Sequence, residues 1–207
     1  MDAKRTSLQE LLNEAAAQSI ELSEEQRDAL LVGAEVLART ARARGISQYD
    51  QVETALIRAM GPALAYFSFS ERPRAGRIAD LGAGNGALGA AIALIEPDVT
   101  VDLLDRAERS YTACELLVKR MRLQNAACVL ASIDKTREAR YDGVVFRALA
   151  QSARALELAH AITRPGGFIG AWHASGDAGY LEPPGSLRLL RTVGTLVPDL
   201  VLTGYRT

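Results

Sequence analysis

A glycine-rich turn near the middle of the chain is the clearest candidate for chemistry. Four glycines fall within eight residues, at Gly82, Gly84, Gly86 and Gly89, directly after the short apolar run 78–81. Because glycine accepts backbone conformations that other residues avoid, such a turn lets a ligand approach the main chain. A helical run of small residues follows. This order of strand, turn and helix is typical of a nucleotide-like cofactor site at the carboxyl end of a parallel strand.

The glycine spacing by itself leaves the class of cofactor open. The pattern G-x-G-x-x-G/A is matched by Gly82, Gly84 and Ala87, and a second frame fits Gly84, Gly86 and Gly89. A nicotinamide or flavin dinucleotide is therefore compatible with the glycines alone.

Two acidic residues favour S-adenosylmethionine instead. Asp80 stands two residues before the first glycine, where a carboxylate would repel a pyrophosphate but suits the ammonium group of a methionine moiety. Asp105 ends the next apolar run, 99–104, at the distance where an acid binds a ribose diol. The predicted cofactor contacts are therefore Asp80, Gly82, Gly84, Gly86, Ala87 and Asp105. The alternative is that both acids only cap the helices that follow them.

Three phrases of the sequence carry a resemblance to a known family. They are the run 80–86 (Asp-Leu-Gly-Ala-Gly-Asn-Gly), the run 97–105, and the run 141–148 followed by Arg-Pro-Gly-Gly at 164–167. They are similar to the bacterial small-subunit ribosomal RNA guanine-N7 methyltransferase G family, also called glucose-inhibited division protein B. The similarity covers roughly 77–174 and implies an α/β, Rossmann-like class I methyltransferase sheet with a terminal β-hairpin.

The resemblance also implies an activity and further site residues. It implies methyl transfer from S-adenosylmethionine to N7 of a guanine in small-subunit ribosomal RNA or the 30S particle, with no metal. Guanine N7 has an in-plane lone pair, so alignment rather than a general base is expected to provide most of the acceleration. Ile133 and Asp134 are expected on the adenine, with an ordinary loop as the alternative. Arg147 is the predicted catalytic residue, which also contacts the cofactor, unless it only forms an ion pair with Asp80 or Asp142.

The chain departs from the family on the side where substrate is expected. A Trp-Asn and Asn-Leu-Thr phrase near 37–47 is absent, and so is a His followed by Asp-Ser-Leu near 58–64. The alternatives are therefore a small-molecule methyltransferase and a catalytically silent S-adenosylmethionine-binding protein. His173 stands where the family has a lysine, and a structural role is favoured over substrate contact.

The predicted elements divide the chain at residue 76. Residues 1–75 have helical periodicity, with capping boxes at Ser7/Glu10 and Ser23/Gln26, and form an N-terminal helical extension. Residues 76–207 form the methyltransferase domain, which ends in strands at 187–197 and 200–205. With 207 residues, 48% of them hydrophobic, the chain is long enough for one sizeable core.

Charge, hydropathy and cysteine spacing indicate the partners and the cellular location of the protein. The net charge of −1 gives no global signal for nucleic acid, although local basic clusters at Arg39/Arg42/Arg44 and Lys119/Arg120/Arg122 could contact phosphates. The sequence has neither an apolar run of membrane length nor a signal peptide, so a cytoplasmic monomer without a membrane partner is expected. Cys114 and Cys128 are far apart in sequence and are expected to be reduced, buried thiols.

Overall fold

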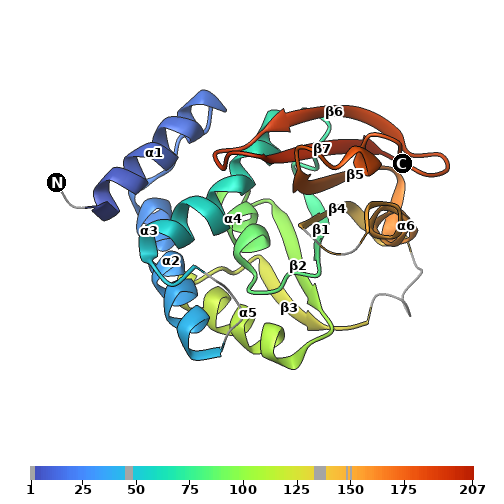
Figure 1. Ribbon diagram of the computed structural model, residues 1–207. Coiled ribbons are helices and arrows are strands. Elements are labelled where there is room, and N and C mark those ends of the chain that lie inside the picture. The colour runs from blue at the N-terminus through green and yellow to red at the C-terminus, as the bar shows by residue number, and fades with distance from the viewer. Residues whose placement is uncertain (1–2, 45–48, 133–138, 148, 150) are drawn as a thin grey trace.

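The computed structural model of the chain describes residues 3–44, 49–132, 139–147, 149 and 151–207. Its centre is a seven-stranded sheet with the order β3-β2-β1-β4-β5-β7-β6 (Figure 1). The strands are β1 Gly76–Leu81, β2 Val99–Asp105, β3 Ala126–Leu130, β4 Tyr141–Arg147, β5 Thr163–Ala174, β6 Arg188–Gly194 and β7 Leu200–Arg206. The first five are parallel, whereas β7 is antiparallel to both of its neighbours. The predicted α/β class and the terminal hairpin are confirmed.

The strand order reverses between β1 and β4. The chain builds outward from β1 through β2 to β3, and then returns to place β4 on the other side of β1. In an open α/β sheet, ligands bind outside the carboxyl ends of the strands at such a reversal. The topology therefore directs attention to the segments that follow β1, β2 and β4.

The helices cover the two faces of the sheet unequally. They are α1 Ala3–Ala17, α2 Glu24–Arg44, α3 Val52–Thr54, the π-helix η1 Ala55–Met60, the 3₁₀-helix η2 Gly61–Ser68, α4 Ala87–Ile95, α5 Glu108–Met121, α6 Ser152–Ile162 and the 3₁₀-helix η4 Ala178–Tyr180. Helices α1 to α5 gather on one side of the sheet, and α6 lies on the other (Figure 1). None of the helices described is both long and apolar enough to cross a bilayer.

Alternating strand residues build two apolar clusters. Ile78 and Val145 contribute to one cluster with α4, α5 and the N-terminal helices, while Ala79 and Val144 contribute to the other with α6 and η4. The N-terminal extension therefore shares a continuous core with the sheet. The predicted boundary at residue 76 coincides with the first residue of β1, and we keep the division into 1–75 and 76–207 as a proposal.

The N-terminal capping signals had different outcomes. The Ser23/Gln26 box is confirmed, because the Gln26 amide donates to Ser23 Oγ at 3.2 Å and the Ser23 amide donates to Gln26 Oε1 at 2.9 Å. The Ser7 box is wrong as a helix start, since α1 already begins at Ala3. The π-helix η1 continues directly into the 3₁₀-helix η2, and Pro62, which has no amide hydrogen, stands at the beginning of η2.

Candidate functional site

The glycine-rich turn adopts backbone conformations that favour glycine. Gly82, Gly84 and Gly86 have φ angles of +70°, +60° and +78°, all in the left-handed region. The amides of Gly82 and Ala83 both donate to the carbonyl of Leu104 at 2.9 Å. The turn is therefore held against β2 at the carboxyl edge of the sheet.

The space around each glycine shows where a ligand can lie. A Cβ atom on Gly82 would stand 2.3 Å from Leu149 Cδ1, and one on Gly86 would stand 2.9 Å from Cys114 Sγ. A Cβ atom on Gly84 would meet nothing closer than the Gly82 carbonyl oxygen at 3.9 Å. Side chains of the protein thus fill the space beside Gly82 and Gly86, whereas the space beside Gly84 is open.

Asp105 connects this turn to the start of α5. Its Oδ2 accepts a hydrogen bond from the Gly84 amide at 2.9 Å, and its Oδ1 accepts one from the Ala107 amide at 2.9 Å. Ala107 is the N-cap residue of α5, so the capping role weighed for Asp105 is present. A carboxylate offers about four lone-pair sites. Capacity therefore remains for the predicted ribose hydroxyls, and that contact stays a prediction.

Asp80 lies beneath the turn, with only 2% of its surface exposed. Its Oδ2 accepts a hydrogen bond from the Gly89 amide in the first turn of α4 at 2.8 Å, so it also caps a helix. Burial raises the pKa of Asp80 to about 7, against the lowering effect of the Gly89 hydrogen bond and of the Arg147 charge. Contact with a ligand ammonium stays a prediction. A buried carboxylate also attracts a cation through space, because screening is weak there.

The remaining positions of the turn differ in kind. Ala87 is fully buried at the start of α4, and its amide donates to Asn85 Oδ1 at 3.2 Å. Asn85 was not singled out from the sequence, although an Asn inside a glycine turn is a known signal for a side chain that bonds to the backbone two residues on. Ile133 and Asp134, predicted to contact adenine, lie outside the described residues.

Arg147 ends β4 and reaches toward the N-terminal extension. Its Nη1 donates to the carbonyl of Arg58 at 3.0 Å and to that of Ala59 at 3.5 Å, both in the π-helix η1. The predicted alternative of an ion pair with Asp142 is wrong, because the Asp142 carboxylate pairs with Arg164 at 2.6 Å. The backbone partners of Arg147 could not be inferred from the sequence, since carbonyl groups carry no residue-type signal.

His173 lies at the end of β5 as part of the packing. Its ring stacks on Tyr180 at 4.2 Å between centroids, and its Nε2 lies 2.8 Å from Thr203 Oγ1. Burial lowers the pKa of His173. These contacts support the structural role that the sequence favoured.

The two basic clusters stand in different places. Lys119, Arg120 and Arg122 lie at the end of α5, which begins after the carboxyl end of β2 and leads back to the amino end of β3. They therefore lie at the end of α5 that points away from the glycine-rich turn. Arg39 is exposed on α2, and the side chains of Arg42 and Arg44 lie outside the described part of the chain. Across the described residues, no group of three potential His, Cys, Asp or Glu ligands gathers to hold a metal ion.

The comparisons with known sequences identify a family. The family model described as rRNA small subunit methyltransferase G matches residues 26–178. A protein of that name from Burkholderia multivorans is 26% identical over 198 residues, 92% of this chain and 86% of the relative. One from Actinobacillus pleuropneumoniae is 24% identical over 200 residues, 95% and 94% of the two chains. One from Chlorobium phaeobacteroides is 31% identical over 101 residues, which span 49% of this chain but only 43% of that relative.

Solved structures agree on the fold. A predicted O-methyltransferase from Agrobacterium tumefaciens matches with a TM-score of 0.58 at 19% identity. The match covers 72% of this chain and 79% of that protein. The tRNA (m1A58) methyltransferase TrmI from Aquifex aeolicus has a TM-score of 0.52 at 16% identity, with 70% and 65% covered. At such low identity these likenesses show the fold alone, and they confirm the class I methyltransferase sheet.

Proposed function

This chain belongs to the rRNA small subunit methyltransferase G family, and we propose that it transfers a methyl group from S-adenosylmethionine to N7 of a guanine in small-subunit ribosomal RNA. The observation that carries the proposal is the family match over residues 26–178, because this segment contains the whole candidate site. It includes the glycine-rich turn, both carboxylates beside it, Arg147 and the π-helix that Arg147 contacts.

The residues around the turn suit S-adenosylmethionine. The open side of Gly84 leaves room for a ligand against the main chain, and Asp105 retains acceptor capacity for a ribose. The buried Asp80 carboxylate favours a cationic ligand over a pyrophosphate. When bound, S-adenosylmethionine supplies a methyl group on a positively charged sulfur. We propose Asp80, Gly82, Gly84, Gly86, Ala87, Asp105, Ile133, Asp134 and Arg147 as the residues that line its site.

The proposed chemistry asks the protein for alignment. Guanine N7 carries a lone pair in the plane of the base, so no proton has to be removed before it attacks a methyl group. Holding two reactants in line can supply a large part of the barrier reduction. The rigid turn between β1 and α4, tied to β2 by two hydrogen bonds, is well suited to fix one of the two reactants.

We propose that Arg147 acts on the target side of the site. A guanidinium has five N–H donors, and the carbonyls of Arg58 and Ala59 engage only Nη1. The remaining donors can bind guanine O6 or a backbone phosphate. The same contact anchors the π-helix η1 against the end of β4, and we propose the exposed side chain of Arg58 in that helix as a further phosphate contact. The ribosomal partner implies a cytoplasmic location, and the monomeric state remains part of the proposal.

The decisive experiment measures methyl transfer from tritiated S-adenosylmethionine to 30S subunits, naked ribosomal RNA and guanosine. Methylation of subunits or RNA at one guanine N7, located by mass spectrometry, is expected. The same N7-methylguanine should be missing from ribosomal RNA of a strain that lacks the protein. Efficient methylation of free guanosine, or of none of the three acceptors, would overturn the proposal in favour of a small-molecule or silent protein.

A matched pair of variants tests the target side. Arg58→Ala should weaken methylation of RNA and reduce its salt dependence, because it removes a phosphate contact beside the site. Lys119→Ala removes a similar charge at the far end of α5 and should change neither property. Affinity for S-adenosylmethionine should be the same in both variants. Equal effects of the two variants on RNA methylation would contradict the assigned target side.

A further inference from the structure

The two cysteines of the chain are neighbours in space. Cys114 lies on α5, and Cys128 lies on β3, where it is the register partner of Leu103. Leu103 and the Cys114 sulfur both lie beside Gly86, and both cysteines belong to the same apolar cluster or pack against it. The sequence separation of the two residues concealed this proximity. Both thiols are free in the structure, and the predicted burial is confirmed for Cys114 but wrong for Cys128, which is half-buried.

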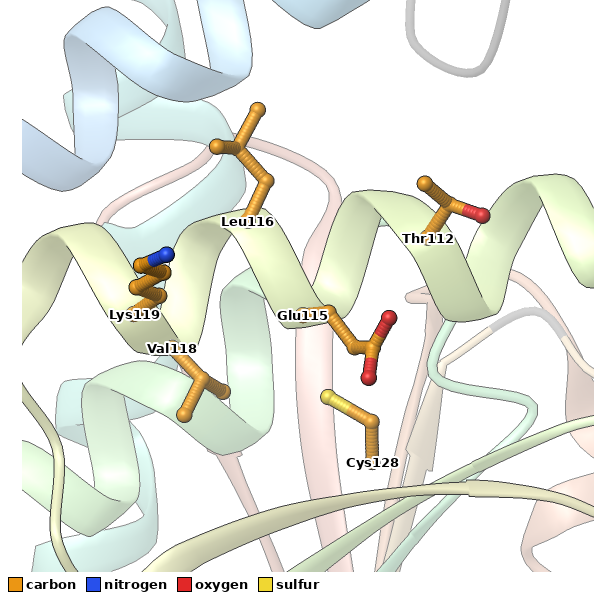
Figure 2. A pocket seen from close by; sticks show the side chains of 6 residues that line it. All are labelled: Thr112, Glu115, Leu116, Val118, Lys119 and Cys128. Atoms are coloured by element: carbon orange, nitrogen blue, oxygen red, sulfur yellow. The ribbon is translucent and has the colours of Figure 1, made fainter.

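Cys128 is reachable from the surface. It lines a pocket between α5 and β3, where its side chain lies next to that of Glu115 (Figure 2). The other lining residues are Thr112, Leu116, Val118 and Lys119. The nearby Cys114 thiol lowers the pKa of Cys128, while burial and the neighbouring charge of Glu115 oppose this effect. Since the thiolate is the nucleophilic form, Cys128 is the more reactive of the two thiols.

Cys114 forms the floor of the glycine-rich turn. Its thiol donates a hydrogen bond to the Gly84 carbonyl, with 3.5 Å between sulfur and oxygen. Its sulfur also fills the space beside Gly86, where an added Cβ atom would come within 2.9 Å. The nearby Cys128 sulfur and burial both raise the pKa of Cys114, so this thiol keeps its proton and acts second.

We propose that Cys128 and Cys114 are a redox-sensitive modification site, at which oxidation by a low-molecular-weight disulfide of the glutathione type links the two sulfurs and weakens cofactor binding at the turn. The part about cofactor binding rests on the proposed function, whereas disulfide formation does not. Disulfides in intracellular proteins are usually transient and catalytic or redox-sensing, which suits a pair of this kind.

The reaction proceeds by two thiol–disulfide exchanges. The Cys128 thiolate attacks one sulfur of the small disulfide, which forms a mixed disulfide and releases one thiolate. Cys114 then loses its proton and attacks Cys128 Sγ, which forms the Cys114–Cys128 bond and releases the second thiolate. The two protein thiols are oxidised by two electrons in all, the small disulfide is reduced to two thiols, and the two protons pass to the released thiolates.

The disulfide acts on the turn through Cys114. A disulfide holds its sulfurs about 2 Å apart, which draws Cys114 toward β3 and away from Gly86. The oxidised sulfur also has no hydrogen to donate to the Gly84 carbonyl. Loss of one hydrogen bond of this kind costs about threefold to tenfold in an equilibrium constant. Affinity for S-adenosylmethionine is expected to fall by roughly this factor.

The test treats the full-length protein with glutathione disulfide and follows two readouts. Mass spectrometry under non-reducing conditions should find a protein two hydrogen atoms lighter, with a peptide that joins Cys114 to Cys128. Calorimetry should find weaker binding of S-adenosylmethionine, restored by dithiothreitol. Cys128→Ser leaves the floor of the turn in place, so it should bind S-adenosylmethionine like the reduced wild type before and after oxidation.

The outcomes separate this proposal from the function proposed above. A stable glutathione adduct on Cys128 without the internal disulfide would overturn it, and so would a disulfide that leaves affinity unchanged. A Cys128→Ser variant that loses affinity on oxidation would place the effect elsewhere and overturn it as well. If the reduced wild type binds no S-adenosylmethionine, the proposed function fails and the cofactor part of this proposal fails with it, while the joined peptide still reports on the disulfide.

Discussion

The acidic side chains at the cofactor edge of the sheet and those farther from it have different partners. At the carboxyl edge, Asp80 and Asp105 accept hydrogen bonds from backbone amides of the turn and of the helices that follow. Farther from that edge, Asp102 is bound by both the Arg77 guanidinium and the Tyr141 hydroxyl, and Asp142 is bound by Arg164.

The difference separates carboxylates suited to a ligand from those suited to the fold. A carboxylate that accepts hydrogen bonds only from neutral amides forms no ion pair with the protein and retains lone pairs for a further donor. A carboxylate paired with an arginine already has a cation beside it, and that arginine occupies lone pairs that a ligand would need. The first kind is expected to affect cofactor affinity, and the second kind is expected to affect stability.

The largest effect is expected from Arg77→Ala. This variant leaves Asp102, which is 1% exposed, with the Tyr141 hydroxyl as a partner but without its cation. Removing one member of such a pair costs about 3 kcal/mol of unfolding free energy, at the low end of the usual range because half of the Arg77 side chain is exposed. Urea unfolding should report this loss. Affinity for S-adenosylmethionine, measured by calorimetry, should stay within about twofold. A large fall in affinity without a loss of stability would erase the distinction between the two groups of acids.

Asp105→Ala should act mainly on affinity. The ribose loses a charged acceptor, which is worth about 1.5–3 kcal/mol, or roughly 10- to 150-fold in Kd. The amides of Gly84 and Ala107 also lose their acceptor, so the unfolding free energy should fall by about 1 kcal/mol. Calorimetry and urea unfolding of the same preparation measure the two effects. Unchanged affinity together with a loss of stability would show that Asp105 serves only as a cap.

Gly84→Ala and Gly166→Ala form a matched pair. Both glycines have positive φ, +60° and +75°, and both have room for a methyl group. Each substitution should therefore cost about 1–2 kcal/mol of stability through backbone strain. Only the methyl group on Gly84 would enter the proposed ligand space, where a clash of about 1–2 kcal/mol corresponds to roughly tenfold weaker binding of S-adenosylmethionine. Equal affinities in the two variants would place the ligand elsewhere.

The smallest effect concerns pH. Since the pKa of Asp80 is raised to about 7 by burial, its charge develops between pH 6 and 8. A cationic ligand should bind more tightly as the pH rises through this window, by no more than about tenfold. Asp80→Asn should flatten the profile in calorimetry across that range. If the affinity of Asp80→Asn depends on pH in the same way as that of the wild type, a group other than Asp80 is titrating.

The same shift predicts an opposite trend for the protein without ligand. The folded-state pKa of Asp80, about 7, lies above the ordinary value of 3.8. Between pH 3.8 and pH 7 the carboxyl group is therefore protonated in the folded state and ionised in the unfolded state. The contribution of Asp80 to stability is then complete below about pH 4 and is lost as the pH rises through about 7. Thermal unfolding of the wild type against Asp80→Asn at pH 6 and pH 8 isolates this contribution.

The sequence alone determined the class of fold and the position of its central site. Apolar runs at fixed distances from glycines and acids set the strands, because a buried parallel strand has to be apolar and a turn with positive φ favours glycine. The Ser23/Gln26 capping box was predictable as well, because its two hydrogen bonds join residues only three positions apart. The family followed from phrases that lie at the ends of those strands, and the family match confirmed it.

Only the tertiary structure decided which partners each site residue has. Arg147 contacts main-chain carbonyls 88 and 89 residues away, and Asp80 lies under the turn on a helix amide. Cys114 and Cys128 lie in one corner of the core because α5 packs against β3. Lys119 lies toward the end of α5 that points away from the turn, because α5 leads back to the amino end of β3. Backbone groups carry no residue-type signal, and long-range contacts depend on how the elements pack.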